Sequence, residues 1–93
     1  MREIPGVQNP VVKHARATGW LAWKMKIEGR NGHPDFHFYK NGVLLIVEFK
    51  AFGKPRNAQQ VLRARDLRDH GFHVHVIDDA DEGIALLDGA FDL

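Results

Sequence analysis

The sequence predicts an α/β domain, because helix signals and strand signals alternate along its 93 residues. An Asn-Gly pair separates two aromatic and β-branched runs, a helix-capping sequence follows these runs, and a valine-rich segment comes next. The composition, with 44% apolar and 27% charged residues, is that of one globular domain over residues 1–93. The expected order is a helix, three strands, a second helix, a further strand and a short helix.

The first helix is expected near the N-terminus. Asn9-Pro10 fits an N-cap followed by proline at the first helical position, and Gly19 fits a helix end. These signals predict a helix of about ten residues. A start near Pro5 is the alternative.

Residues 20–27 are expected to form a half-buried strand, because apolar side chains alternate there with alanine and lysine. The apolar side of this strand consists of Leu21, Trp23, Met25 and Ile27. A polar loop over residues 28–32 follows. Four aromatic side chains are expected in the core or at an interface rather than stacked on bases: Trp20, Trp23, Phe36 and Phe38.

Residues 36–39 and 43–50 are expected to pair as a β-hairpin. Asn41-Gly42 lies between them, and this dipeptide is the strongest short signal for a two-residue type I′ turn. Lys40 and Val43 then flank the turn, and the register of the whole hairpin follows by counting outward from them.

This register brings three charged residues to one face at the end of the hairpin. Asp35 lies directly opposite Glu48 in a non-hydrogen-bonded pair, with Cβ atoms about 4.5–5.5 Å apart. Lys50 shares their face because side chains alternate along a strand. His33 lies opposite Lys50 and is a further candidate for contact with substrate or with the site residues.

Two carboxylates at that distance repel each other unless a positive charge lies between them. Mg²⁺ or Mn²⁺ satisfies both, keeps several waters as further ligands and commonly engages phosphate. Such an ion acidifies a bound water, which the Lys50 ammonium is placed to orient. The structural alternative is that Asp35 caps a turn after Pro34, and that Glu48 and Lys50 form an ordinary surface ion pair.

The second helix is expected to begin at a capping box. In Asn57-Ala58-Gln59-Gln60, Asn57 fits the N-cap and Gln60 fits the third helical position, from which it reaches back. A helix start also favours anions. Gln60 therefore has a capping role and an active-site role, and the two are compatible.

Gly71 leads into a valine-rich strand. Its core side is expected to consist of Phe72, Val74 and Val76. His73 and His75 then share the opposite side, and His37 shares the face of Asp35, so a mixed zinc site can be imagined. The strand pattern favours a purely structural role for these histidines.

The acidic tail over residues 78–93 is expected to contain a short closing helix. Its apolar residues are Ile84, Leu86, Leu87 and Phe91. A chain of this size buries only about 60–65% of its unfolded surface, so some of these side chains could lie at a dimer interface.

The net charge of +1 is divided unevenly along the chain. Residues 1–65 hold 12 of the 13 Lys and Arg residues and 4 acids, whereas residues 66–93 hold one Arg and 8 acids. A basic part with few acids is typical of a phosphate-binding surface. The candidate DNA contacts are Lys24, Lys26, Arg30, Lys54, Arg56, Arg63 and Arg65, although each alone is more often a solvated surface residue.

The absence of cysteine excludes disulfides, thiolate metal sites and a cysteine nucleophile. The longest purely apolar run is Val43 to Val47, which is too short for a membrane span, and the charged start does not fit a signal peptide. We therefore expect a soluble cytoplasmic protein.

The ordered motifs between Gln8 and Leu87 resemble those of the VRR-NUC domain, the virus-type replication-repair nuclease of the PD-(D/E)xK superfamily. The matching motifs are Gly32-His33-Pro34-Asp35, Glu48-Phe49-Lys50, Gly53-Lys54, Gln60 and Gly71. This resemblance implies a restriction-endonuclease-like mixed sheet flanked by helices, with an αβββαβ core. It also implies Mg²⁺- or Mn²⁺-dependent hydrolysis of DNA phosphodiester bonds. If the chain resembles the stand-alone viral or bacterial members of this family, the resemblance further implies a homodimer that cuts branched DNA such as Holliday junctions.

The resemblance also implies the roles of individual residues. Asp35 and Glu48 correspond to the metal-binding acids, Lys50 to the catalytic lysine, Gln60 to the helix glutamine, and the backbone carbonyl of Phe49 to a further metal ligand. Gln8 stands where many members carry a glutamate. Its amide can accept a hydrogen bond from a metal-bound water but supplies no charge, so we expect at most one well-held ion.

The expected function is thus a metal-dependent, structure-specific DNA endonuclease of a bacterial or phage-infected cell. Two alternatives stay open at this point. One is a non-catalytic DNA-binding module with the same fold, which Gln8 weakly favours. The other is a partner-dependent subunit whose missing parts lie on another chain.

Overall fold

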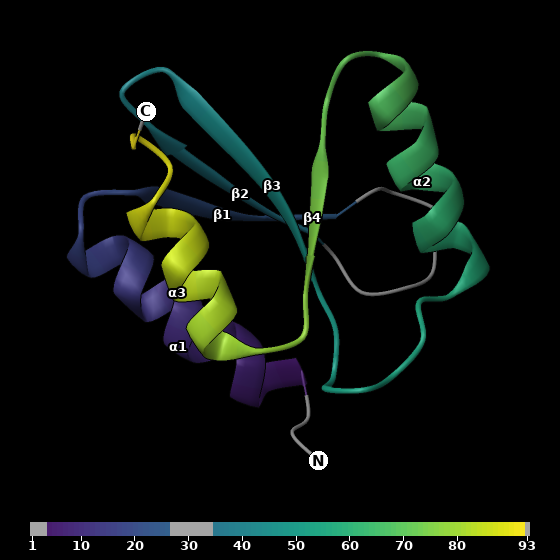
Figure 1. Ribbon diagram of the computed structural model, residues 1–93, viewed down its shortest axis with the longest axis horizontal. Coiled ribbons are helices and arrows are strands. Elements are labelled where there is room, and N and C mark those ends of the chain that lie inside the picture. The colour runs from purple at the N-terminus through teal and green to yellow at the C-terminus, as the bar shows by residue number, and fades with distance from the viewer. Residues whose placement is uncertain (1–3, 27–34, 93) are drawn as a thin grey trace.

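The computed structural model describes residues 4–26 and 35–92 (Figure 1). Its elements, in chain order, are α1 (Ile4–Ala17), β1 (Leu21–Met25), β2 (Asp35–Lys40), β3 (Val43–Phe49), α2 (Ala58–Asp69), β4 (Val74–Ile77) and α3 (Ala80–Asp88). The four strands form one sheet in the order β1-β2-β3-β4. β1, β2 and β3 pair antiparallel and β4 pairs parallel to β3, so the sheet is mixed, as expected.

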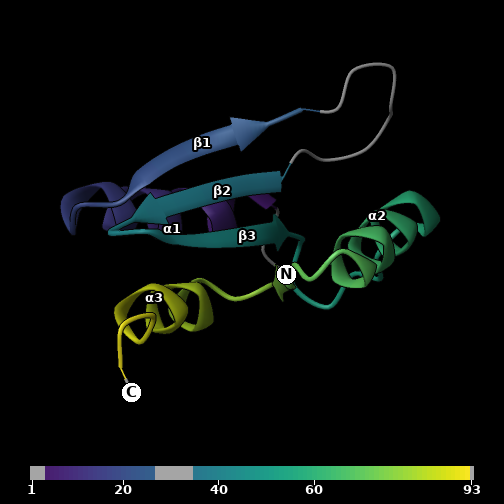
Figure 2. The same cartoon turned by 90° about the horizontal axis from the view of Figure 1, so that it is seen from above.

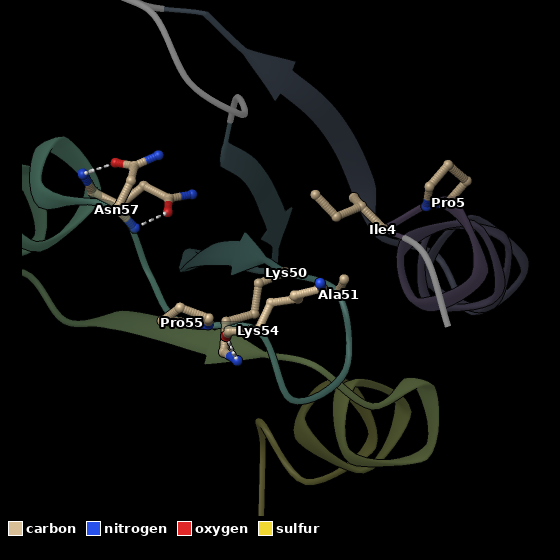
Figure 3. Close-up of a pocket in the computed structure, with 8 residues that line it drawn as sticks. Ile4, Pro5, Lys50, Ala51, Lys54, Pro55 and Asn57 are labelled. Carbon is tan, nitrogen blue, oxygen red and sulfur yellow. Dashed lines mark hydrogen bonds between the residues drawn. The ribbon is translucent and has the colours of Figure 1, made fainter. Parts of the chain in front are cut away.

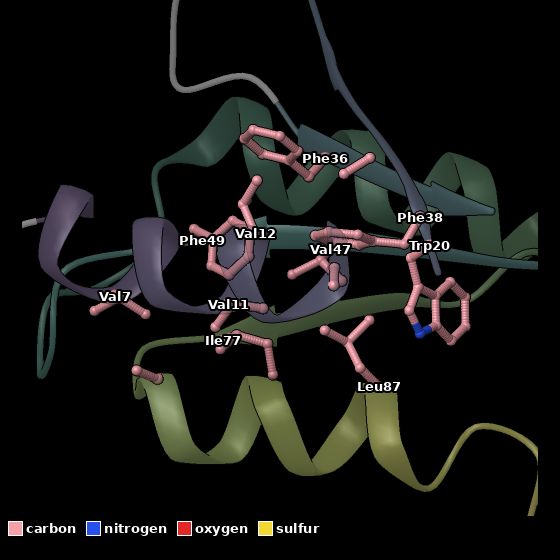
Figure 4. Packing of buried hydrophobic residues seen from close by; sticks show 13 residues of the cluster. Val7, Val11, Val12, Trp20, Phe36, Phe38, Val47, Phe49, Ile77 and Leu87 are labelled. Carbon is pink, nitrogen blue, oxygen red and sulfur yellow. The ribbon is translucent and has the colours of Figure 1, made fainter. Parts of the chain in front are cut away.

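The core lies between one face of the sheet and the helices α1 and α3 (Figures 1 and 4). Phe38, Phe49 and Val47 project from the sheet into this layer and are at most 1% exposed. The two helices approach each other closely at Gly83, where a Cβ atom would lie 2.6 Å from Cγ2 of Val11. The second helix, α2, lies apart from this layer in both views (Figures 1 and 2).

Helix α1 begins at Ile4 rather than at Asn9-Pro10, so the expected start was wrong and the alternative near Pro5 agrees with the structure. Pro10 lies inside the helix, where proline costs about 3 kcal/mol. Val7 is 0% exposed, and burying a valine contributes about 1.5–3 kcal/mol. The free energy gained by burying Val7 is therefore of the same order as the cost of Pro10 and offsets it.

The end of α1 follows the expected signal at Gly19. This glycine has a φ of 91°, and the Trp20 amide donates a 2.9 Å hydrogen bond back to the Ala15 carbonyl. Such a left-handed residue closes the last helical turn and is tolerated best by glycine. The chain then passes directly into β1.

The side of β1 that faces the core is not the one that its sequence pattern predicts. Ala22 is 5% exposed and packs in the core, whereas Leu21 and Trp23 are 47% and 54% exposed. Helix α1 packs against the Ala22 side, where a small side chain lets the helix approach. The apolar side of β1 instead belongs to the other face of the sheet.

The hairpin forms as expected. Asn41 and Gly42 have φ values of 48° and 81°, so both central residues are left-handed, as a type I′ turn requires. Lys40 pairs with Val43 across this turn, which confirms the starting point of the register.

The expected core side of β4 was wrong. β4 runs parallel to β3 with His75 beside Val47, so the histidine side of β4 faces the core layer. Ile77 shares this side and is 4% exposed, whereas Phe72 is 49% exposed. The physical reason is the position of α3, which follows β4 and returns over the face that holds Ile77 and His73.

No helix in the described ranges is long and apolar enough to cross a lipid bilayer.

Candidate active site

The hairpin register brings Asp35 and Glu48 together. Phe36 pairs with Val47, so the next step along both strands places Asp35, the first residue of β2, opposite Glu48. The two residues are 7% and 1% exposed. Two acidic groups therefore share a buried position at the end of the hairpin.

Glu48 is neutralised by Arg56, which lies on the loop between β3 and α2. The guanidinium donates from Nε to Oε2 at 2.9 Å and from Nη2 to Oε1 at 3.0 Å. This bidentate geometry is the strongest form of an arginine-carboxylate pair. The hydrogen bonds to Glu48 raise the pKa of Arg56.

Asp35 is paired with Arg63 of α2, whose Nη2 lies 3.0 Å from Oδ1. Burial nevertheless raises the pKa of Asp35, against the lowering effect of Arg63, and the charge of Glu48 raises this pKa further. The site therefore favours additional positive charge near Asp35.

Both arginines were expected as DNA contacts, and their pairing with the acids was not foreseen. A sequence signal exists for Arg63 alone. It lies three residues after Gln60 in α2, so both project from one side of the helix. Arg56 precedes the N-cap Asn57, so helical spacing does not place it.

Lys50 directly follows β3, and the hydrogen bonds of its ammonium go to partners other than Asp35 and Glu48. Its hydrogen bonds go to the backbone carbonyl of Lys54 and, at 3.5 Å, to Oδ2 of Asp78. Asp78 was not among the expected site residues. Because Phe49 pairs with Ile77 in the parallel ladder, the residues after them, Lys50 and Asp78, meet at the same edge of the sheet.

Gln60 caps the start of α2 as expected. Its backbone amide donates to Oδ1 of Asn57 at 2.8 Å, and its Oε1 accepts from the Asn57 amide at 3.0 Å, which completes a capping box. The residue is 4% exposed although α2 is otherwise largely solvated. The capping role is therefore confirmed, and an active-site role remains compatible with it.

A pocket of about 380 Å³ lies between the start of α1 and the loop that leads into α2 (Figure 3). Its lining residues are Ile4, Pro5, Lys50, Ala51, Lys54, Pro55, Asn57 and Gln60. The pocket thus joins Lys50 to Gln60, and Arg56, which holds Glu48, lies between two of its lining residues. Neither Asp35 nor Glu48 is among its lining residues.

Comparisons with known proteins place this geometry in context. No protein-family model and no curated protein matches the chain. A solved structure described as a VRR_NUC domain matches with a TM-score of 0.81 and 25% sequence identity, covering 98% of this chain and 100% of that one. The chain has the fold of a VRR-NUC domain. The likeness supports a nuclease-type domain.

Other predicted site residues occupy different environments in the structure. Gln8 is half-buried on α1. The Phe49 side chain lies in the core and is 1% exposed, so a ligand role concerns its backbone carbonyl alone. His33 and Arg30 lie outside the described residues.

The donor set at the end of the hairpin fits a hard divalent cation. Asp35 and Glu48 offer carboxylate oxygens, Phe49 offers a carbonyl oxygen, and waters would complete the shell. No group of three or more His, Cys, Asp or Glu side chains within residues 4–26 and 35–92 could hold a metal by itself.

The mixed zinc site is excluded by the faces of the sheet. His73 and His75 lie on the α3 side, and their rings are 4.4 Å apart. His37 and Asp35 lie on the other side of the sheet, because they alternate with the core residue Phe36. The imagined ligands therefore cannot meet around one ion.

Proposed function

We propose that this chain is a Mg²⁺- or Mn²⁺-dependent DNA endonuclease of the PD-(D/E)xK type. The observation that carries the proposal is the buried pair of Asp35 and Glu48 at the end of the hairpin, in a chain with the VRR-NUC fold. Burying two like charges side by side is costly, so such a pair needs positive charge, which Arg56 and Arg63 supply here and a metal ion would supply when bound.

Asp35, Glu48 and the backbone carbonyl of Phe49 would hold the ion. When bound, such an ion supplies an acidified water as nucleophile and neutralises charge on a phosphoryl oxygen. Lys50 follows Glu48 by two residues, and its ammonium would leave the Lys54 carbonyl to orient that water or to contact the phosphate. Gln60 would position the start of α2 against the site, through the capping box that it forms with its own helix.

DNA binding is supported by exposed basic residues on several elements of the fold. Four of the basic residues are exposed: Lys24 on β1, Lys26 directly after β1, Lys54 on the loop before α2, and Arg65 on α2. We propose them as the principal phosphate contacts, since Arg56 and Arg63 are engaged by the acids. A cationic surface of this kind binds DNA with a strong dependence on salt.

A homodimer that cuts branched DNA is the finer part of the proposal. The sheet face that carries the acids also exposes apolar side chains, with Leu21 47%, Trp23 54% and Leu44 37% exposed. These come from β1 and β3 and form an apolar surface on the side opposite to α1 and α3. A second copy covering this surface would bring two sites together, as cutting opposite strands of a four-way junction requires.

The nuclease test compares wild-type protein with Glu48→Gln on end-labelled four-way junction, flap and linear DNA, in Mg²⁺, Mn²⁺ or EDTA. Asp66→Asn, an exposed acid of α2, is the matched control. We expect metal-dependent cutting by the wild type and the control and none by Glu48→Gln. Paired nicks in the junction would support the dimeric resolvase, and sedimentation of the wild type and Trp23→Gln would test the interface.

A non-catalytic DNA-binding module is the second candidate. It is favoured by the two arginine pairs, which neutralise both acids without a metal ion. Binding to DNA without cutting in every metal condition would establish this alternative and refute the nuclease. Strict monomers that cut no DNA would instead favour a partner-dependent subunit.

A further inference from the structure

The start of α2 supplies both counter-charges of the acidic pair. Arg56 precedes the helix and binds Glu48, and Arg63 lies two turns later and binds Asp35. The side chains of Arg63 and Asp35 are 15% and 8% exposed, and those of Arg56 and Glu48 are 27% and 2% exposed. Each acid therefore has its own guanidinium in a position largely shielded from water.

The oxygens engaged by the arginines are the ones a cation would need. Arg56 contacts both oxygens of Glu48, and Arg63 contacts one oxygen of Asp35. An ion held by both carboxylates would compete directly with these hydrogen bonds. Because a guanidinium and a divalent cation repel each other, both cannot occupy the same oxygens at full strength.

These pairs also hold α2 in place. Gln60 is the only buried residue described on α2, and Val61 and Leu62 are each 46% exposed. The helix has no continuous apolar face against the sheet, so its position depends strongly on the polar contacts of its first two turns. Loss of those contacts would loosen the whole helix.

We infer that Arg56 and Arg63 are resident counter-ions that occupy the acidic pair in the metal-free protein and that a divalent cation must displace in order to bind. This inference rests on the proposed function, because it concerns the same metal site. The inference goes beyond the proposed function because it assigns two roles to the arginines. They set the affinity for the metal, and they link metal binding to the position of α2.

The test measures Mn²⁺ affinity by calorimetry and by the loss of the free-ion EPR signal, without DNA. Arg56→Gln and Arg63→Gln remove the competing charge, and Arg68→Gln removes an exposed charge from the same helix as a matched control. We expect Arg56→Gln and Arg63→Gln to bind Mn²⁺ on the order of tenfold more tightly than wild type, with no change for Arg68→Gln.

A second measurement keeps the test informative if a glutamine variant fails to fold. In uniformly ¹⁵N-labelled wild-type protein, addition of Mg²⁺ should shift the Arg56 Nε–H signal toward that of a solvated arginine. Arg56→Lys keeps the charge but loses the bidentate geometry, so its Mn²⁺ affinity should lie between those of wild type and Arg56→Gln.

The outcomes separate the inference from the proposed function. If Mn²⁺ binds to wild type but not to Glu48→Gln, and neither Arg56→Gln nor Arg63→Gln binds more tightly than Arg68→Gln, the counter-ion role is refuted and the metal site stands. If the Arg56 signal is unmoved at saturating Mg²⁺, the inference is likewise refuted. If neither wild type nor the arginine variants bind Mn²⁺, the metal-dependent function itself fails.

Discussion

Arg56 binds both carboxylate oxygens of Glu48, a residue that is itself only 1% exposed. Removing one partner of such a pair leaves an uncompensated buried charge. Arg56→Ala should therefore lower the free energy of unfolding by about 2–3 kcal/mol in EDTA, somewhat below the cost for a fully buried pair because the guanidinium is partly exposed. Urea unfolding measures this loss. The double variant with Glu48→Leu should recover part of it, and simple additivity of the two changes would contradict the pairing.

Gly83 of α3 is expected to be intolerant of a side chain. A Cβ atom there would lie 2.6 Å from Cγ2 of Val11 and 3.3 Å from Cγ2 of Ile77, both in the core. Gly83→Ala should lower the free energy of unfolding by about 1–3 kcal/mol, although alanine favours helix. Thermal or urea unfolding provides the measurement. Val11→Ala makes room, so the double variant should be less destabilised than the sum of the two single changes.

Gln60 and Asn57 share one capping box, which allows its two roles to be separated. Asn57→Ala should cost about 1 kcal/mol of stability while specific activity is retained. Gln60→Ala should lower activity more than stability if the side chain also serves the site. The comparison uses melting temperature and cleavage rate for both variants. A large melting loss with full specific activity in Gln60→Ala would restrict this residue to capping.

His75 should make stability depend on pH. Burial lowers its pKa below the ordinary value of 6.5, and the charge of the neighbouring His73 lowers it further. The unfolded chain therefore takes up a proton before the folded one does. This contribution to stability is complete above pH 6.5 and is lost as the pH falls below 6.5 toward the lowered pKa.

The pH effect is measured by urea unfolding between about pH 7.5 and pH 5. His75→Gln should lose less stability than wild type over this range. His70→Gln, at an exposed position after α2, is the control. Equal pH profiles for wild type and His75→Gln would contradict the prediction.

The exposed basic residues should determine how DNA affinity varies with salt. Each phosphate contact contributes about one unit to the slope of log affinity against log salt concentration. Lys24→Gln and Arg65→Gln should each reduce this slope by about 1. Lys13→Gln, on the exposed side of α1, should leave it unchanged. Fluorescence anisotropy over a salt series tests the prediction, and a flat salt dependence of the wild type would refute a phosphate-binding surface.

The parts of the fold that depend on neighbouring residues were predictable from the sequence. The Asn41-Gly42 turn fixes the hairpin register, and that register alone brings Asp35 opposite Glu48. The capping box likewise locates the start of α2 at Asn57. In each case a short backbone conformation or a local hydrogen bond determines the result.

The parts that depend on which face of the sheet is covered were not predictable. The alternation in β1 is real, but α1 covers the Ala22 side and leaves Trp23 exposed. The same holds for β4, where α3 covers the side of His75. Alternation identifies two sides of a strand, and tertiary packing decides which of them is buried. The pairing of Arg56 with Glu48 was missed because a sequence shows charges but not their partners.

The parallel pairing of β4 with β3 also affects the order in which the chain assembles. The hairpin of β2 and β3 joins neighbouring residues, and such hairpins form within about 1–10 μs. The ladder between Ile46 and Val74 instead requires the whole crossover through α2 to close first. We therefore expect the hairpin to form early in folding and β4 to join late. The two acids would then be brought together before the helix that supplies their counter-charges is in place.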